Sequence, residues 1–378
     1  MEKRDNSNLG SQSLLLVLNG LMSFHIGALL AIRKEKPARP INFQYTNERL
    51  LRWIGLGMIT ISLVPTIWVI QEYLQIVMFS GYFGLFARDA ETGIEAAPRI
   101  LASFLVPGAL FLLAGCKSYP IGKYLSLFII LSYVIIQFFL GARLWSTMPI
   151  IAYTWLWHNS IRHLPKWVIY VSAGATLFLL FPLIATVREL PGLERLDFGV
   201  IVEQFISIAN PAISIIREMG GTLLTIASTI EIFSRTKGFQ WGLTYGYAFL
   251  TLVPNLFWDV HPSVAYGSPS RWLVETIAPW TAAKGGGYGY SFIAEAYLNF
   301  GGVGAPVVLA IQGLLFARFV RWAQRSGDPI RMATVASWVA FFFIYARGET
   351  SSIVRPLLWY AVLPYLLYIF LRRFRGVR

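Results

Sequence analysis

Residues 119–140, YPIGKYLSLFIILSYVIIQFFL, form an apolar run that contains a single charged residue, Lys123. A helix needs about 20 such residues to cross a hydrocarbon core about 30 Å thick. Similar runs recur along the chain of 378 residues, over residues 13–32, 53–79, 98–115, 145–159, 167–187, 291–317, 332–346 and 356–371. No polar stretch between them reaches the size of a soluble domain. The sequence therefore predicts an all-α fold, a polytopic transmembrane bundle of about nine spans that forms a single integral membrane domain over residues 1–378.

The composition excludes several kinds of site. Hydrophobic residues make up 56% of the chain and charged residues 13%, against about 25% charged residues in soluble domains. The single cysteine, Cys116, excludes an internal disulfide and a cysteine-based metal cluster. The four histidines, His25, His158, His163 and His261, are too scattered to indicate a metal site. We therefore expect neither a metal nor another cofactor.

The net charge of +13 is concentrated on one set of connecting segments. With the spans above, that set holds eighteen Lys and Arg against three acids, whereas the other set holds fourteen against sixteen. Cytoplasmic loops carry the excess of Lys and Arg, so we expect the N-terminus outside and the C-terminus inside. The basic excess indicates topology and attraction to anionic lipid, and no nucleic-acid-binding motif accompanies it. A nucleic-acid partner is therefore not expected.

The segment 188–290 departs from the pattern of short connections and is expected outside the cytoplasm. Ordered connections of this length are usually functional. Within it, residues 219–233 and 241–258 are apolar enough to enter the membrane. We expect re-entrant or interfacial helices there, with a transmembrane hairpin as the alternative. The internal repeat typical of many transporters is not visible in the sequence.

Basic residues gather near the apolar helix ends of the expected outer face. Arginine provides ten of these twelve residues: Arg88, Arg99, Arg143, Arg188, Arg195, Arg217, Arg235, Lys237, Arg271, Lys284, Arg347 and Arg355. Arginine binds phosphate bidentately, so such a group beside the bilayer suits a polyprenyl diphosphate. The alternative is that each one is an interfacial anchor or half of an ion pair. Arg143 and Arg347 are the stronger candidates, because apolar helices flank the short loops that carry them.

Two acids in the same region are candidates for a general base. Glu218 follows Arg217 and precedes Gly220 and Gly221, and Glu295 lies near the outer end of a span. An ionisable side chain at that depth is costly unless it is paired or functional. Either carboxylate could deprotonate a sugar hydroxyl, and a salt bridge to an arginine is the alternative. The glycine-rich run 282–292, AAKGGGYGYSF, is expected to lead into a helix whose N-terminus could receive an anion.

Several of these motifs resemble the oligosaccharide repeat-unit polymerases, also called O-antigen or Wzy-type polymerases. The strongest match is G-x-G-x-S-F-I-A-E-A-Y-L-N-F-G-x-x-G, formed by Gly287, Gly289, Ser291, Glu295, Tyr297, Asn299, Phe300, Gly301 and Gly304. Weaker matches are Arg217-Glu218 with Gly220-Gly221, Gly242-x-Thr244-Tyr245 followed by Pro254, Gly141-x-Arg143, and Arg347-Gly348. The resemblance covers the C-terminal two thirds of the chain, and only the Asn-Phe-Gly region is specific by itself.

The resemblance implies a membrane glycosyltransferase of the bacterial inner membrane whose active site faces the periplasm or exterior. A GT-C-like arrangement is one form that its helical bundle can take. The reaction would transfer a growing glycan from undecaprenyl diphosphate to a fresh lipid-linked repeat unit. The lipid-linked oligosaccharide and the bilayer are the expected partners, with a Wzz-type chain-length regulator and a flippase as further candidates.

The resemblance also suggests roles for individual residues. The diphosphates would be bound by Arg143, Arg217, Arg271 and Arg347. Glu218 or Glu295 would be the base or would position the acceptor. The glycan would contact Tyr245, Trp258, Trp272, Tyr288 and Asn299.

Three other functions fit parts of the same evidence. An O-antigen ligase has the same diphosphate leaving group and differs in its acceptor. A flippase or other transporter of lipid-linked sugar should show paired broken helices and repeat symmetry. A non-catalytic assembly partner would not need outward arginines together with glutamates.

Overall fold

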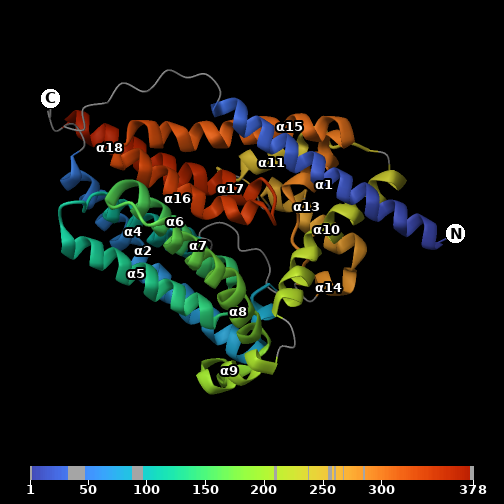
Figure 1. The fold of residues 1–378 in the computed structure, drawn as a ribbon, viewed down its shortest axis with the longest axis horizontal. Coiled ribbons are helices and arrows are strands. Elements are labelled where there is room, and N and C mark those ends of the chain that lie inside the picture. The colour runs from blue at the N-terminus through green and yellow to red at the C-terminus, as the bar shows by residue number, and fades with distance from the viewer. Residues whose placement is uncertain are drawn as a thin grey trace. The chain divides into compact units, whose positions relative to one another are not determined.

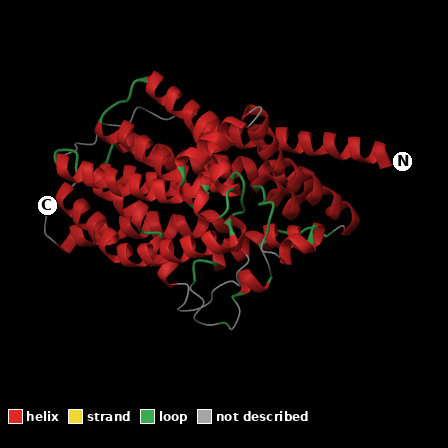
Figure 2. Ribbon diagram, turned by 90° about the horizontal axis from the view of Figure 1, so that it is seen from below, coloured by secondary structure: helices red, strands yellow, loops and turns green. Residues whose placement is uncertain are grey.

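The computed structural model describes residues 2–32, 47–86, 97–207, 211–236, 238–253, 258, 261–266, 268–283 and 286–374. Every regular element in these ranges is a helix, which confirms the predicted all-α class (Figure 2). The chain divides into two compact units. Unit 1 comprises Met1–Ile41, Met219–Ser326 and Ile344–Arg355, and unit 2 comprises Asn42–Glu218, Gly327–Phe343 and Pro356–Arg378.

Unit 1 is built around two long helices that lie side by side, α1 and α15 (Figure 1). Its helices are α1 (Glu2–Ile32), the part of α10 (Pro211–Thr236) from Met219 onward, α11 (Leu243–Leu250), α12 (Pro262–Ala265), α13 (Pro269–Ile277), α14 (Pro279–Ala283), α15 (Phe292–Ser326) and α17 (Ser351–Pro356). Gly27 of α1 faces the backbone of Ala310, and Gly313 of α15 faces the backbone of Phe24, so closely that neither position has room for a Cβ atom. Small residues at these points let the two backbones approach each other, as in other membrane helix pairs.

Helix α15 is interrupted at Gly301, whose φ of 67° and ψ of −171° are not helical. The ring of Phe239 occupies the place where a Cβ of residue 301 would lie. Only glycine adopts this conformation at low cost, and its missing side chain admits the ring. The break sets apart a short N-terminal part of α15, residues 292–300, which carries Glu295 and Asn299.

Unit 2 is a bundle whose innermost helix is α4, all ten residues of which are buried. Its elements are α2 (Glu48–Ser80), η2 (Tyr82–Phe86), α3 (Ala97–Ala102), α4 (Leu105–Ala114), α5 (Pro120–Phe139), α6 (Arg143–Leu156), α7 (Lys166–Ala175), α8 (Phe181–Glu189), η6 (Gly192–Leu196), α9 (Phe198–Ser207), α16 (Pro329–Tyr345, up to Phe343) and α18 (Leu363–Phe374), with π-helical turns at Trp157–Ile161, Thr176–Leu180 and Leu357–Val362. A buried hydroxyl joins two of these helices, because Ser126 donates to the carbonyl of Ala109 at 2.6 Å. Such bonds satisfy polar groups where lipid offers no partner.

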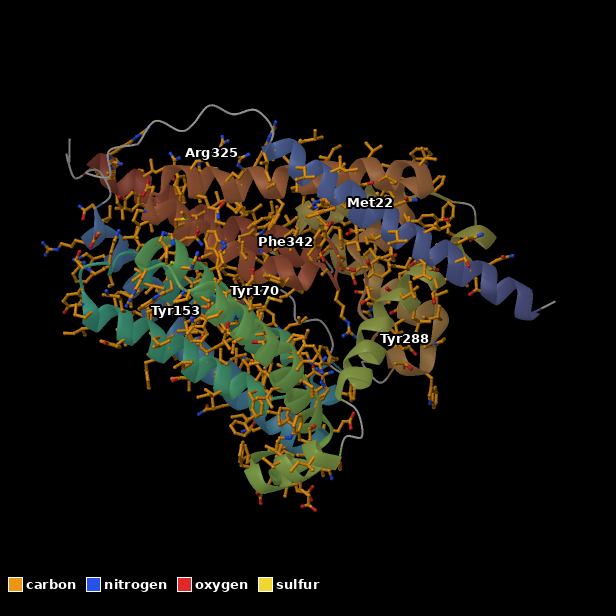
Figure 3. The ribbon with its side chains drawn as sticks, viewed as in Figure 1. Met22, Tyr153, Tyr170, Tyr288, Arg325 and Phe342 are labelled. Atoms are coloured by element: carbon orange, nitrogen blue, oxygen red, sulfur yellow. The ribbon has the colours of Figure 1, made fainter. Side chains whose placement is uncertain are left out.

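Seven helical segments in the described residues are long and apolar enough to cross a membrane: Asn8–Ile32, Glu48–Ser80, Ala97–Ala114, Pro120–Phe139, Lys166–Glu189, Phe292–Ser326 and Ser351–Phe374. They coincide with seven of the nine predicted spans, and the other two predictions fall on the shorter helices α6 and α16, of 14 and 17 residues. The segments expose large apolar side chains, such as Met22 of α1, which is 61% exposed and labelled in Figure 3. An apolar exterior is what lipid contact requires, so the chain is a multi-pass membrane protein.

Candidate active site

The predicted carboxylate Glu295 lies in the first turn of α15 and is 1% exposed. Its Oε2 atom accepts two hydrogen bonds from Thr350, one from the backbone N–H and one from the hydroxyl, both at 2.8 Å. Its Oε1 atom accepts a third bond from the hydroxyl of Thr244 at 3.0 Å. The carboxylate thus joins α15 to α11 and to the loop before α17. Its position near a helix N-terminus also favours negative charge.

Asn299, one turn farther along α15, completes this connection. Its side-chain amide donates to the hydroxyl of Thr244 at 2.7 Å and to the backbone carbonyl of Glu295 at 2.8 Å. Its Oδ1 atom accepts the N–H of Gly242 at 2.9 Å, immediately before α11. Asn299 is fully buried. It therefore acts on Thr244 and Glu295 rather than facing a ligand in this state of the protein.

The loop after α16 presents Arg347 at the surface of unit 1. The Arg347 side chain is exposed, while its backbone carbonyl accepts the N–H of Tyr290 at 3.4 Å. A Cβ on Gly289 would lie 3.1 Å from that carbonyl oxygen and 3.5 Å from Arg347 Nε, and Gly289 has a φ of +73°. A Cβ on Gly221 of α10 would lie 3.8 Å from Arg347 Nη2. Two glycines therefore lie close to Arg347, whose side chain is exposed.

Glu349 fixes the same loop and was not predicted. Its Oε2 atom accepts the N–H of Ser270 at 2.9 Å, and its Oε1 atom accepts the hydroxyl of Ser351 at 3.0 Å. Glu349 is 7% exposed. Burial raises the pKa of this carboxyl above its ordinary value, and the bonds from Ser270 and Ser351 offset part of that effect. Thr350 was missed as well. The one available signal was the sequence Arg-Gly-Glu-Thr, in which both follow the predicted Arg347.

The predicted glycan-contacting aromatics also belong to unit 1. Tyr245 of α11 stacks on Phe300, with ring centroids 6.2 Å apart. Tyr288, labelled in Figure 3, is partly buried in the coil that leads into α15. Trp272 of α13 packs against the core of unit 1, and Trp258 is 37% exposed. Their contact with a glycan stays a prediction.

The remaining predicted residues belong to α13 in unit 1 and to α10 and α6 in unit 2. Arg271 is on the exposed face of α13, where its Nε atom pairs with Glu275 at 2.8 Å. Arg217 and Glu218 fall within the backbone of α10, and their side chains lie outside the described residues. Arg143 begins α6 in unit 2, donates to the carbonyl of Phe181 at 3.1 Å and lies over the ring of the same residue.

Two other basic residues of unit 2, Arg188 and Arg195, also donate to backbone carbonyls. Arg188 donates to the carbonyl of Gly141 at 3.3 Å, two residues before Arg143, and lies over the ring of Tyr82. Arg195 is 1% exposed and donates to the carbonyl of Leu190 at 2.6 Å. Burial lowers the pKa of Arg195.

The candidate site consists of the exposed guanidinium of Arg347 on a loop that two buried carboxylates, Glu295 and Glu349, hold in place. Three contacts fix the loop: the N–H of Tyr290 on the carbonyl of Arg347, Glu349 on Ser270, and Thr350 on Glu295. Such preorganisation suits the recognition of an anion. The glycine-rich run leads into α15 as predicted, and its residues 286–291, which directly precede the helix, bring Gly289 to Arg347.

One of three comparisons with known proteins gives a match. No curated protein and no solved structure matches the chain. A family model described as O-antigen polysaccharide polymerase Wzy matches residues 1–375. This match spans nearly the whole chain, including the N-terminal region that the sequence motifs did not cover. A membrane-embedded, all-helical chain that matches this model over nearly its full length belongs to the O-antigen polysaccharide polymerase family, whose members polymerise glycan repeat units.

Proposed function

We propose that this polymerase acts on undecaprenyl-diphosphate-linked repeat units at the outer face of the bacterial cytoplasmic membrane. The growing glycan leaves its lipid diphosphate and joins a sugar hydroxyl of a fresh lipid-linked repeat unit. The exposed Arg347, flanked by two glycines and held by buried carboxylates, is the observation that carries the proposal. A membrane protein needs such a group where a lipid diphosphate departs with two negative phosphates.

In this proposal Arg347 stabilises the leaving diphosphate. Arginine presents planar N–H donors that match phosphate oxygens, and Gly289 lets the chain before α15 pack closely against Arg347 while the Arg347 side chain stays exposed. Arg143, Arg217 and Arg271 are further diphosphate-binding candidates, although the ion pair of Arg271 with Glu275 makes it the weaker one in unit 1. The reaction requires no added nucleotide sugar, because the lipid diphosphate is the activated donor.

Glu295 is proposed to receive the proton of the acceptor hydroxyl, with Glu218 as the alternative. In the described state three donors occupy the two oxygens of Glu295. The proposal keeps two predictions about the chain, namely a single membrane domain and an external segment over residues 188–290. It also keeps a chain-length regulator and a flippase as partners.

Reconstitution with a defined substrate tests the proposal. The purified protein is placed in liposomes with a synthetic polyprenyl-diphosphate repeat unit, without nucleotide sugar or metal, and products are separated on a gel. We expect a ladder that Arg347→Gln reduces by about 100-fold or more, as for the loss of a charge-stabilising donor. The matched control is Arg162→Gln, at an exposed arginine of unit 2 on the expected cytoplasmic side.

Two outcomes would contradict the proposal. A full ladder from Arg347→Gln would remove Arg347 from the site. No ladder from the unaltered protein with a matched repeat unit, accompanied by movement of labelled lipid between leaflets, would indicate a transporter instead.

A further inference from the structure

The buried position of Glu295 restricts the route by which a proton can reach its carboxylate. A general base must reach the proton that it removes, either directly or through one intervening group. Glu295 is 1% exposed, and protein donors occupy both of its oxygens. A bulky sugar acceptor therefore cannot contact this carboxylate directly. Any proton that reaches Glu295 must pass through one of the groups bonded to it.

Two hydroxyls contact the carboxylate, and they differ in accessibility. Thr350 is 7% exposed, and its hydroxyl is also bonded to the buried hydroxyl of Tyr345 at 3.0 Å. Thr244 is partly exposed and lies in the first turn of α11. Among the described hydroxyls bonded to Glu295, that of Thr244 is thus the one nearer the surface of unit 1.

The hydrogen-bond directions around Thr244 suit proton transfer. The amide nitrogen of Asn299, Nδ2, can only donate a hydrogen bond. At 2.7 Å it therefore occupies one lone pair of the Thr244 oxygen. The hydroxyl hydrogen then points to Glu295 Oε1 at 3.0 Å. A hydroxyl oxygen has a second lone pair, which remains able to accept a hydrogen bond from an incoming sugar hydroxyl. Asn299 therefore orients Thr244 for donation toward Glu295 and acceptance from the acceptor.

We propose that Thr244 is a catalytic residue that relays the acceptor proton to Glu295. The inference rests on the proposed function. As the acceptor oxygen forms its bond to the anomeric carbon, its proton passes to Thr244 Oγ1, and the Thr244 hydroxyl proton passes to Glu295 Oε1. The bond between the anomeric carbon and the diphosphate oxygen breaks, and the diphosphate leaves with the electron pair. Glu295 then returns the proton through Thr244 to solvent or to the diphosphate.

The test compares rates and pH profiles of reconstituted variants in a single transfer between synthetic polyprenyl-diphosphate repeat units. We expect Thr244→Val to slow transfer by about 100-fold or more, the usual contribution of general base catalysis. Thr244→Ser keeps the hydroxyl and should retain the rate within about threefold. The matched control is Thr229→Val, because Thr229 is another threonine of unit 1, and its buried hydroxyl is bonded to Tyr290 at 3.2 Å rather than to Glu295.

The pH profile separates a relay from a merely structural role. Four titratable groups face Glu295, namely Glu349, Tyr245, Tyr290 and Tyr345, and all of them are kept in the variants. We expect Thr244→Val and Glu295→Gln each to remove the acid limb of the profile, because each disconnects the base. The double variant should be no slower than the slower single variant by more than about twofold, since residues that act as a unit are not additive.

The results distinguish this inference from the proposed function. An active wild type with an equally active Thr244→Val variant would overturn the relay and leave the polymerase assignment intact. An unchanged acid limb, or rate losses that multiply in the double variant, would also overturn the relay. An inactive wild type would overturn both. If Thr244→Val fails to fold, the comparison of Thr244→Ala with Thr244→Ser replaces it, and equal losses in these two variants would refute the relay.

Discussion

At the scale of single residues, the buried carboxyl of Glu349 holds the loop that carries Arg347, and its burial disfavours its charged form. Its oxygens accept hydrogen bonds from Ser270 and Ser351, which tie the loop to α13 and to the start of α17. The same burial disfavours the charged form and raises the pKa of Glu349. The protein therefore positions Arg347 by means of a carboxylate that folding makes harder to ionise.

This raised pKa predicts a dependence of stability on pH. The folded protein holds the Glu349 proton more tightly than the unfolded chain, so its contribution to stability is fully present below the ordinary glutamate value. That contribution is lost as the pH rises through the raised pKa. Thermal unfolding of the purified protein across this range should show a melting temperature that falls with pH more steeply than in Glu349→Gln.

Glu203→Gln is the matched control for this measurement, because Glu203 is exposed on α9. Its melting temperatures should follow those of the unaltered protein at every pH. Equal slopes for Glu349→Gln and the unaltered protein would show that Glu349 does not titrate differently in the folded state.

At the scale of elements, the packing of α1 against α15 supports the helix that carries Glu295. Gly27 and Gly313 bring the two backbones together, and Arg321 of α15 donates to the carbonyl of Ala31 at the end of α1 at 2.6 Å. The part of α15 that carries Glu295 is separated by the break at Gly301 from Gly313 and Arg321, but it also packs on α1, because Gly20 of α1 lies against both Ile293 and Leu309. Displacing α15 from α1 would therefore also displace Glu295 from Thr244 and Thr350.

One added methyl group should test this pairing. Gly27→Ala places a Cβ against the backbone of Ala310, so we expect a loss of about 1–3 kcal/mol in the free energy of unfolding, the range for overpacked cores. Gly10→Ala in the same helix meets no atom within 4 Å and should be neutral or stabilising by up to about 1 kcal/mol. Unfolding in detergent measures both. Equal stabilities for the two variants would show that the helices do not pack closely at Gly27.

At the scale of the whole molecule, the charge distribution predicts how the chain is oriented in the membrane. The distribution of Lys and Arg predicts that the N-terminus is outside and the C-terminus in the cytoplasm, and the proposed outer active site depends on that prediction. The single cysteine, Cys116, is fully buried. The natural protein therefore offers a low background for cysteine labelling.

Cysteines introduced near the two ends should report this orientation. Asn8→Cys in α1 and Phe374→Cys at the end of α18 are both at exposed positions. We expect a membrane-impermeant maleimide to label Asn8→Cys in intact cells, and Phe374→Cys only after the membrane is permeabilised. Labelling of both positions from the same side would exclude an odd number of crossings and contradict the predicted orientation.

Some properties of this protein followed from the sequence alone. Hydropathy depends on local composition, so the all-α membrane class and most spans could be predicted without tertiary contacts. The family followed from the contiguous motif that contains Glu295, Asn299 and Gly301, and the match over residues 1–375 confirmed it. The two predicted spans that fall on α6 and α16 correspond to shorter helices, because short apolar helices resemble spans in composition.

Other properties were decided by the tertiary structure. Thr350 bonds to Glu295 across 55 positions of sequence, and Thr244 does so across 51. Neither spacing has a period or motif that could indicate contact, and Glu349 was missed for the same reason. The sequence determined which groups the chain has and that they lie near membrane helices. Only packing decided that Glu295 is buried, which hydroxyls cover it and which arginine stays accessible, because burial and hydrogen bonding depend on residues that folding brings together from distant parts of the chain.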